Sequence, residues 1–553
     1  MGAIRSRLFA ACATATLVVA CGGGGGGAPA PGPTPPPPVP PAYTATGKAA
    51  AGDTIVHLFE WRWADIAREC EVWLGPKGFK GVQVSPPSEH AVFAANNYPW
   101  WQRYQTVSYR LNQSRSGTLA EFQDMVTRCR NSNAGVDIYV DAVINHMTAG
   151  SGTGSAGSAY SKYSYPDVPY AAADFHSACG INSYQDQFQV QNCELVGLAD
   201  LKTEDDSVRT KIANYLIALH TLGVAGFRID AAKHIPAWDL DQILKKVNDA
   251  AAAANPPRPR PYVFLEVINN AGEAVTASQY YGVGTYLGGS ATGAGSDITE
   301  FQFGYRVTDA FLGRNSATLN SALLNLQNAL MPGDKAMVFV DNHDNQRGDN
   351  LYYASTLSGQ PVYELAQIYA LAQPVGVVSL MSSYGFDRSS QAGRDAGPPS
   401  TAPGVTQSTF IDPNTSRCNP TFGTASVGSW VCEHRARAIF NMVAFRKATA
   451  GAPLTNCGRV DWTIGDPNRV AFCRDGKGLV AINRTSTPAA GVILPATGLP
   501  TGNYCDIAQF DYTPTGANTG ICSGPPIGVN PGGQTQITVP AWGAVAIHIN
   551  ARL

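Results

Sequence analysis

The sequence predicts an α/β fold: a (β/α)8 TIM barrel with a small subdomain inserted after its third strand, followed by a C-terminal antiparallel β-sandwich. Three observations support this prediction. Apolar, β-branched runs recur along the chain and end in charged or histidine residues, as buried parallel strands do. Amphipathic helical stretches lie between these runs. After about residue 450 the pattern changes to short strand-like runs separated by turn residues.

Eight strands can be assigned to the barrel in chain order. We expect them at 55–59, 81–85, 136–141, 224–230, 262–266, 298–305, 336–341 and 377–383. Between them, stretches such as 206–222 and 238–253 repeat apolar residues with the helical period. In a barrel of this kind the chemistry lies at the carboxyl ends of the strands.

The remaining segments define the other parts of the chain. Residues 147–201 are rich in Gly, Ser and Tyr and are predicted to form the inserted subdomain, which separates the barrel parts 49–146 and 202–450. Residues 451–553 contain the strand-like runs 469–473, 478–483 and 543–550 and are predicted to form the sandwich. We expect no further module beyond these parts.

The N-terminus has the pattern of an export signal rather than of a folded element. Arg5 and Arg7 precede an apolar stretch, 8–20, that is shorter than the roughly 20 residues needed to span a bilayer. The run 18–21 resembles a bacterial lipobox, so we expect residues 1–21 to be a lipoprotein-type signal peptide with a lipid on Cys21. An ordinary signal peptide with a nearby cysteine is the alternative. Residues 22–48, rich in Gly and Pro, then form a linker.

Composition excludes several classes of function. The chain has 553 residues and is 44% hydrophobic, enough for a large core. Its net charge is −2, its pI is about 6.5, and it has no run of Lys or Arg. Nothing therefore points to nucleic acid or to an anionic membrane surface as a partner, and the only predicted membrane contact is the lipid on Cys21.

The cysteines predict disulfides. Cys12 and Cys21 belong to the signal segment, and the remaining ten are an even number in a chain predicted to be exported. Zinc binding is the alternative, but the sequence contains no Cys-x-x-Cys pair. Spacing alone does not give the connectivity.

Four short blocks carry the polar residues at the predicted strand ends. They are 141–146, 226–234, 264–268 and 339–344. Asp230, Glu266 and Asp344 come from three different strands and should converge on one rim of the barrel. Arg228 precedes Asp230 by two residues on an alternating strand, so both side chains point to the same side and can form a charge-assisted hydrogen bond. For a single acidic residue at a strand end, a helix cap or a loop salt bridge would be the ordinary interpretation.

These four blocks, in this order, resemble the signature regions of the α-amylase family of glycoside hydrolases, and their residues are most similar to those of the animal-type members. The resemblance runs from about Thr54 to the C-terminus and includes the segments 78–87, 99–105, 192–201 and 430–435. It implies an endo-acting hydrolase of internal α-1,4-glucosidic bonds in starch, glycogen and maltooligosaccharides that retains anomeric configuration. The alternatives are a related transglycosylase, a maltooligosaccharide-forming enzyme, or a surface glycan-binding lipoprotein that has lost catalysis.

The resemblance also implies catalytic roles. Asp230 would be the nucleophile, Glu266 the general acid/base, and Asp344 a third carboxylate that binds sugar hydroxyls. Glu266 follows Phe264 and Leu265, and such apolar surroundings favour the protonated form that a general acid needs.

Further residues would bind the sugar chain. His146 and His343 would hydrogen-bond the sugar in the cleaved subsite, with buried structural histidines as the alternative. Lys233 and His234 would serve the acceptor side. An aromatic platform on the donor side would be formed by Trp100, Trp101, Tyr104 and Gln105, although one of the two adjacent tryptophans could instead be a core residue.

Calcium is the implied structural metal, because a hard cation takes oxygen ligands from several segments. Asn145 and Asp200 would supply side chains, His234 its backbone carbonyl, and Gln191 or Asn192 further ligands. Asn192 is neutral where many relatives place Asp, and Asn145 as a purely structural residue is the alternative.

Two departures from the family pattern affect the expected function. The chloride site of chloride-activated relatives would use Arg228 and Asn342, but Ser379 replaces the expected basic residue, so we predict weak or absent chloride activation. The glycine-rich lid that often follows the fourth block is replaced by 348–353, which leaves acceptor-side affinity open.

The resemblance pairs Cys70 with Cys129, Cys179 with Cys193, Cys418 with Cys432, and Cys505 with Cys522. Cys457 and Cys473 remain, and their pairing rests on elimination alone. The expected protein is thus an exported monomer, held at the cell surface or the periplasmic face by its lipid, or otherwise secreted.

Overall fold

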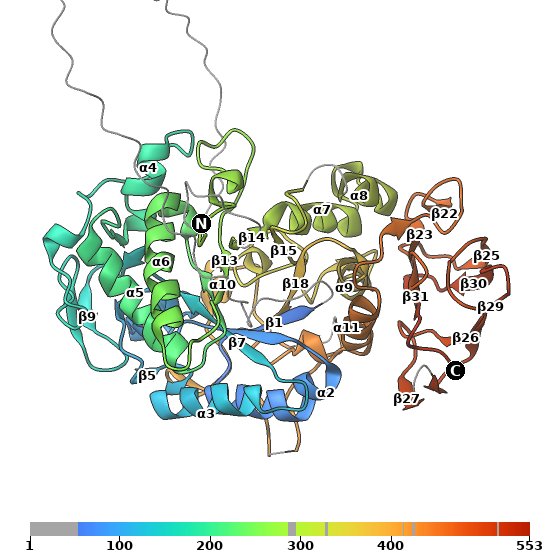
Figure 1. The fold of residues 1–553 in the computed structure, drawn as a ribbon, viewed down its shortest axis with the longest axis horizontal. Helices are drawn as coiled ribbons and strands as arrows, with labels where there is room; N and C mark the ends of the chain where they lie inside the picture. Colours follow the sequence, from blue (N-terminus) through green and yellow to red (C-terminus); the bar gives the residue numbers. More distant parts are fainter. Residues whose placement is uncertain (1–52, 286–294, 327–329, 413, 423–425, 517–518) are drawn as a thin grey trace, which may run out of the picture. The chain divides into compact units, whose positions relative to one another are not determined.

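The computed structural model describes residues 53–285, 295–326, 330–412, 414–422, 426–516 and 519–553 (Figure 1). The predicted signal peptide, Cys21 and the linker 22–48 lie outside the described residues. Within the described ranges, no helix combines the length and apolar character needed to cross a membrane.

A closed parallel barrel forms the centre of the fold and confirms the predicted class. Each strand pairs in parallel with its neighbours, and the last strand returns to the first. The strands are β1 (Thr54–Leu58), β2 (Gly81–Val84), β7 (Asp137–Ala142), β12 (Gly226–Ile229), β13 (Tyr262–Leu265), β14 (Asp297–Glu300), β15 (Ala336–Val338) and β18 (Val377–Ser382). Nearly every residue of these strands is buried, as expected for strands covered on both faces.

Strand register brings the polar residues together. β12 pairs with β7 so that Arg228 lies opposite Asp141, and it pairs with β13 so that Arg228 also lies opposite Phe264. Asp230 and Glu266 follow directly after β12 and β13. The two carboxylates therefore leave the sheet at the same edge.

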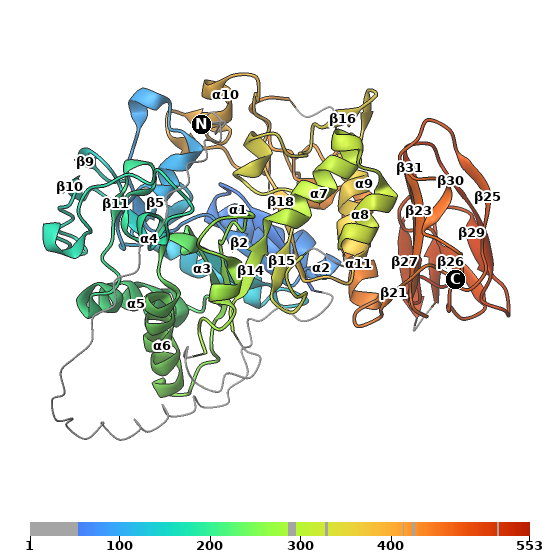
Figure 2. The ribbon, with the colours of Figure 1, turned by 90° about the horizontal axis from the view of Figure 1, so that it is seen from above.

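Helices connect the strands and cover the barrel (Figures 1 and 2). These helices are α1 (Trp63–Glu69), α3 (Leu119–Arg130), α5 (Asp206–Thr221), α6 (Ala237–Ala253), α7 (Phe301–Leu312), α8 (Leu319–Leu326), α9 (Tyr363–Ala372) and α11 (Arg437–Ala448). Among them, α3, α6 and α7 are clearly amphipathic and bury the side that faces the strands. The start of α3 is fixed by a capping box between Thr118 and Glu121.

The sixth strand is shorter than the sequence pattern predicted. We expected a strand over 298–305, but β14 ends at Glu300 and α7 begins at Phe301. The Glu300 carboxylate accepts a hydrogen bond of 3.0 Å from the backbone N–H of Gln302 and so caps the new helix. Phe303, Val307 and Phe311 then follow the helical period and are buried.

The inserted segment between β7 and α5 is irregular, as predicted. Strand β8 (His146–Met147) pairs with β11 (Ala199–Asp200), which brings the two ends of the insertion together. Between them lie the hairpin β9 (Ser151–Thr153) and β10 (Ala159–Ser161) and the helix α4 (Gln187–Asn192). The disulfide Cys179–Cys193 joins α4 to the preceding loop.

The C-terminal part contains two antiparallel sheets that share a core (Figure 2). The predicted strands are confirmed as β23 (Arg469–Arg474), β24 (Gly478–Asn483) and β31 (Gly543–His548), which pair side by side together with β21 (Leu454–Thr455) and β22 (Thr463–Asp466). The second sheet contains β25 (Ala489–Leu494), β30 (Thr535–Val539), β29 (Pro526–Val529) and β26 (Gly502–Cys505). A separate hairpin joins β27 (Tyr512–Gly516) to β28 (Thr519–Cys522).

Five disulfides close the fold. They comprise the four pairs implied by the resemblance and the bond between Cys457 and Cys473 that elimination had left. All ten cysteines of the described residues are therefore used, which leaves none of these thiols for zinc. Disulfides of this number belong to proteins that fold outside the reducing cytosol.

Candidate active site

One arginine gathers three carboxylates at the carboxyl end of the barrel. Nη1 of Arg228 donates to Asp141 Oδ1 at 2.7 Å and to Asp230 Oδ1 at 2.6 Å. Its Nη2 lies 2.8 Å from Glu266 Oε1. The predicted pair of Arg228 and Asp230 is thus present, and the same guanidinium also places Glu266 beside Asp230.

The turn after β12 fixes Glu266 from a second side. Ala231 has a left-handed backbone conformation, with φ of 49°, which is uncommon for a residue with a Cβ. In this conformation its backbone N–H donates to Glu266 Oε2 at 2.9 Å. Backbone strain of this kind is typical of functional sites, where the surrounding structure maintains it.

Burial shifts the pKa of two carboxyl groups in this carboxylate cluster. Burial, together with the charges of Glu266 and Asp141, raises the pKa of Asp230 well above its ordinary value, and Arg228 opposes this shift. Burial likewise raises the pKa of Asp141 against the effect of Arg228. At both Asp230 and Asp141 the effect of burial outweighs the attraction of the Arg228 charge.

Asp344 lies on the open side of this cluster. Its side chain keeps 45% of its surface accessible, and Oδ2 lies 3.3 Å from Nε2 of His343. Desolvation and the charge of Glu266 raise the pKa of Asp344, while Arg228 and Arg347 lower it. Solvent reaches this carboxylate and weakens the net shift.

His343 is held between two aromatic rings. Its ring stacks on Tyr104, with centroids 5.0 Å apart, and on Phe59, with centroids 5.3 Å apart. Burial and nearby Arg228 lower the pKa of His343 well below its ordinary value. The imidazole is therefore neutral and can donate from Nε2.

The two adjacent tryptophans have different surroundings. Trp100, in the 3-10 helix η3 (Trp100–Tyr104), packs against Phe59 and His343, and its Nε1 donates to the carbonyl of Arg394 at 3.0 Å. Trp101 instead packs against Phe93, and both tryptophans are partly buried. Neither is therefore a fully buried core residue, and Trp100 is the one that contacts His343.

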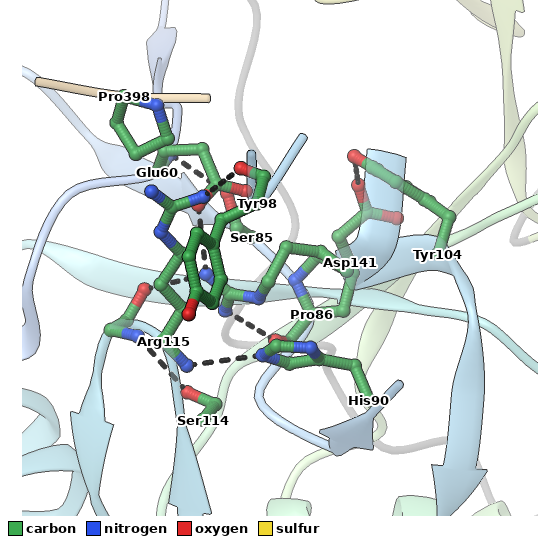
Figure 3. A network of polar contacts seen from close by, with 12 residues as sticks. Glu60, Ser85, Pro86, His90, Tyr98, Tyr104, Ser114, Arg115, Asp141 and Pro398 are labelled. Carbon is green, nitrogen blue, oxygen red and sulfur yellow. Dashed lines mark hydrogen bonds and ion pairs between the residues drawn. The ribbon is translucent and has the colours of Figure 1, made fainter. Parts of the chain in front are cut away.

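A polar network supports this segment from behind (Figure 3). Arg103 of η3 lies 3.2 Å from Glu60, and both side chains are fully buried. Arg115 donates to the carbonyl of Tyr98 at 2.6 Å, and its backbone N–H donates to Nε2 of His90 at 3.2 Å. Tyr104 extends from the same helix toward the barrel and donates to Asp141 Oδ2 at 2.9 Å.

The other predicted sugar-binding residues surround the cluster. The Oε1 atom of Gln105 accepts from Thr148 Oγ1 at 2.8 Å, and His146 Nε2 donates to the carbonyl of Tyr104 at 3.1 Å. Lys233 is buried, pairs with Glu273 and donates to the carbonyl of Ile268 at 2.6 Å. The charge of Lys233 is therefore already neutralised by a protein carboxylate.

The structure brings only some of the predicted calcium ligands into contact. Asn145 Nδ2 lies 3.4 Å from Asp200 Oδ1, and both residues are buried where β8 pairs with β11. His234 donates from Nδ1 to the carbonyl of Val190 at 2.7 Å, next to α4. Gln191 donates to the hydroxyl of Tyr280, and Asn192 donates to the carbonyl of Phe188 in its own helix.

The described ranges contain no cluster of three or more His, Cys, Asp and Glu side chains arranged to hold a metal. Burial raises the pKa of Asp200 to about 6, and His176, at 2.7 Å from Oδ2, opposes this shift. His176 was not predicted, because only the folding of the insertion brings it to Asp200.

A small cavity lies inside the barrel below the cluster. Its volume is about 20 Å³, enough for one water-sized molecule. Arg228, Asn342 and Ser379, the three positions of the expected chloride site, all line it. Ser379 contributes no charge to this cavity. The charge of Arg228 is already engaged by three carboxylates of the protein, those of Asp141, Asp230 and Glu266.

Some residues of the site were not assigned a role from the sequence. Asp141 stands in the first polar block, but its two bonds, to Arg228 and to Tyr104, depend on strand register. Phe59 ends the predicted first strand and gave no chemical signal. Arg347 follows the fourth block and contacts His343, four residues earlier, and Trp100, which lies far from it in the sequence.

Comparison with known proteins agrees with this geometry. The family model "Alpha amylase, catalytic domain" matches residues 72–371, and "Alpha amylase, C-terminal all-beta domain" matches residues 462–550. The alpha-amylase of Thermomonospora curvata is 45% identical over 90% of this chain and 74% of its own length. The alpha-amylase of Tribolium castaneum is 43% identical, covering 91% of this chain and 96% of the relative.

Solved structures give the same result. The crystal structure of wild-type alpha-amylase I from Eisenia fetida has a TM-score of 0.76 and 36% identity, covering 92% of this chain and 99% of that one. A variant of the same earthworm enzyme, solved in complex with maltohexaose, matches equally well. From its barrel through its C-terminal β-domain, the chain therefore belongs to the α-amylase family of glycoside hydrolases.

Proposed function

We propose that this enzyme hydrolyses internal α-1,4-glucosidic bonds of starch, glycogen and maltooligosaccharides with retention of anomeric configuration. The observation that carries this proposal is the single guanidinium of Arg228, which contacts both Asp230 and Glu266. Retaining glycosidases need two carboxyl groups roughly 5 Å apart, one as nucleophile and one as acid. Because one planar guanidinium contacts both carboxylates, their separation is expected to match the short spacing of retaining enzymes rather than the wider spacing of inverting enzymes.

The reaction then has two steps, formation and hydrolysis of a covalent glycosyl-enzyme. Glu266 gives its proton to the glycosidic oxygen as the bond from that oxygen to the anomeric carbon breaks, and Asp230 Oδ forms a bond to the same carbon. The leaving chain departs with the proton. Glu266 then takes a proton from a water molecule whose oxygen attacks the anomeric carbon, and the bond to Asp230 breaks. Both carboxyl groups return to their starting states.

The surrounding residues position the sugar in the cleaved subsite. Asp344 and His343 lie 3.3 Å apart and present a carboxylate and a neutral imidazole to the sugar hydroxyls. His146, which lies next to Tyr104 of η3, hydrogen-bonds the same sugar. The donor-side wall is formed by Trp100, Trp101, Tyr104 and Gln105, and the acceptor side by Lys233 and His234. Flat aromatic rings suit the apolar C–H faces of glucose.

Calcium is proposed as a structural ion beside the cleft. The donor set suits a hard cation, because Asn145 and Asp200 are buried side chains that carry oxygen, with Asn145 Nδ2 3.4 Å from Asp200 Oδ1, and because Gln191 and the His234 backbone lie on adjoining elements. When bound, the ion would tie the inserted subdomain to the barrel. Asn192 keeps its hydrogen bond within α4 and would contribute least.

Chloride is not proposed as an activator. Ser379 supplies no positive charge, and the two Nη atoms of Arg228 already contact Asp141, Asp230 and Glu266. Activity at saturating calcium is therefore expected to change little between chloride and nitrate buffers of the same ionic strength.

The location of the protein is proposed from its N-terminal sequence. The lipobox-like run ending in Cys21 would place a lipid on the mature N-terminus, and the Gly/Pro-rich linker would hold a monomeric enzyme at the cell surface or periplasmic face. The mass of the N-terminal peptide from membrane fractions of the native host tests this. A diacylated Cys21 supports it, whereas a free N-terminus elsewhere shows an ordinary secreted enzyme.

Release of reducing sugar from soluble starch tests the function. The purified protein should release maltooligosaccharides rapidly from within the chain, and Asp230→Asn should lose at least about 10⁴-fold in kcat. A calcium chelator should lower the Tm of both proteins equally. A folded parent protein that releases nothing from starch, glycogen or maltooligosaccharides would overturn the hydrolase assignment and favour a glycan-binding role.

A further inference from the structure

Arg347 is a buried arginine at the edge of the site that the catalytic steps do not use. It ends the 3-10 helix η9 (Asn345–Arg347), directly after Asp344 in the fold, and only 6% of its surface is accessible. Its Nη1 donates to the carbonyl of His343 at 2.6 Å. The guanidinium therefore holds the backbone of the turn that carries His343 and Asp344.

Aromatic rings enclose the same guanidinium. Its Cζ lies 4.6 Å from the ring centroid of Trp100 and 4.5 Å from that of Phe386. Phe59 and Tyr384 complete the enclosure at 5.3 and 5.6 Å. These rings come from the loops after β1 and β18 and from η3, so the guanidinium packs between segments that are far apart in the sequence.

One carbonyl joins Arg347 to Trp100. The Nε of Arg347 and the Nε1 of Trp100 both donate to the carbonyl oxygen of Arg394, each at 3.0 Å. Nη2 of Arg347 donates to the hydroxyl of Tyr384 at 2.9 Å, and that hydroxyl donates to the carbonyl of Ala396 at 2.8 Å. Segment 384–396 is thus fixed against the same guanidinium.

The partners of Arg347 are unusual for a buried charge. In the described part of the chain no carboxylate lies within 4.0 Å of it, and its contacts are carbonyls, one hydroxyl and rings. Burying a charge without a carboxylate in direct contact is costly, and hydrophobic residues could fill the same volume. Only a planar fork with several donors can bond to all three segments and stack on the rings.

We propose that Arg347 is a positioning residue for the reaction. It fixes the His343–Asp344 turn, the Trp100 ring and the Tyr384 ring as one wall of the cleaved subsite. This inference rests on the proposed glycosidase function. Since it acts through residues that contact the sugar in the transition state, its loss lowers kcat more than it raises KM.

Steady-state kinetics on maltoheptaose test this proposal with Arg347→Met and Arg347→Lys. We expect Arg347→Met to lower kcat about 10- to 100-fold with KM changed less than about threefold, because small displacements of positioning groups have effects of this size. Arg347→Lys keeps the charge but not the fork and should recover only a small part of kcat.

Arg388→Met is the matched control. Arg388 stacks on Tyr352, with its Cζ 4.2 Å from the ring centroid, and donates to the carbonyl of Asn350 at 3.0 Å. It is also a partly buried arginine of the segment after β18, but it contacts neither Trp100 nor His343. A merely structural role for Arg347 predicts that both Met variants lose Tm and leave the kcat of the folded fraction unchanged.

The outcomes separate the possibilities. Loss of kcat in Arg347→Met alone, measured on protein shown to be folded by its thermal transition, supports the proposal. Equal kcat in the Arg347 and Arg388 variants, or full recovery by lysine, overturns it. If Arg347→Met does not fold, the lysine variant decides by the same criterion. An inactive parent protein would instead overturn the proposed function, which keeps the two failures distinct.

Discussion

Two arginines are buried at the carboxyl end of the barrel, and their surroundings differ. Arg228, next to the end of β12, contacts Asp141, Asp230 and Glu266. Arg347, beyond the end of β15, contacts backbone carbonyls, a hydroxyl and aromatic rings. The first sets the charge of the site and the second sets its shape. A strand residue suits the first role because register places it beside carboxylates on neighbouring strands, whereas a loop residue can join several segments.

The largest loss of kcat is expected for a substitution of the arginine that contacts the carboxylates. Arg228→Lys should lower kcat by about 10²- to 10³-fold, because one ammonium group cannot contact three carboxylates in the geometry of a guanidinium. Arg347→Lys should cost clearly less. Comparison of kcat for the two lysine variants on the same oligosaccharide checks this order, and equal losses would remove the distinction between the two arginines.

A third buried arginine extends the comparison to stability. Arg103 of η3 and Glu60 form a fully buried ion pair. Glu60→Gln should lower the free energy of unfolding by about 3 kcal/mol, because it leaves the Arg103 charge without its counter-ion. The kcat of the folded variant should stay close to that of the parent. Denaturant unfolding followed by kinetics on the folded protein measures both, and a variant as stable as the parent would contradict the expectation.

The smallest effect concerns a neutral histidine in the same network. Burial and nearby Arg103 lower the pKa of His90 to about 3. The unfolded chain binds a proton on this residue near pH 6.5, so the stability it contributes is complete above that pH and falls as the pH decreases toward 3.

His90→Gln should remove this dependence. Between pH 8 and pH 5 the loss of unfolding free energy in the variant should be smaller than in the parent by about 2 kcal/mol. Denaturant titrations of both proteins at the two pH values give the difference directly. Parallel losses in the two proteins would show that His90 is not a neutral group in the folded state.

Much of the barrel could be predicted because buried parallel strands have a clear apolar pattern and the polar blocks mark where they end. The predicted sixth strand was too long, because Phe301 and Phe303 continue its apolar pattern. In the structure the strand ends at Glu300, whose carboxylate caps α7. Asp230 and Arg228 could be related from spacing along one strand. The contacts of Asp141 and Arg347 could not, because they depend on register and on loops that meet only in the folded chain.

The tryptophan pair shows the same limit. The sequence left open a core position for one of the two rings, and it did not indicate which ring contacts the site. Trp100 takes that position because the carbonyl of Arg394, on a segment far away in the sequence, accepts its Nε1–H at 3.0 Å.

The most direct test of the central claim is to trap the covalent intermediate. A 5-fluoro-α-maltosyl fluoride should inactivate the enzyme slowly, and mass spectrometry of its peptides should find one added sugar chain on the peptide that contains Asp230. Asp230→Asn should take up no label. A label on Asp344 or Glu266, or release of the inverted anomer by the unlabelled enzyme in a proton NMR time course, would contradict the assignment of Asp230 as the nucleophile held by Arg228.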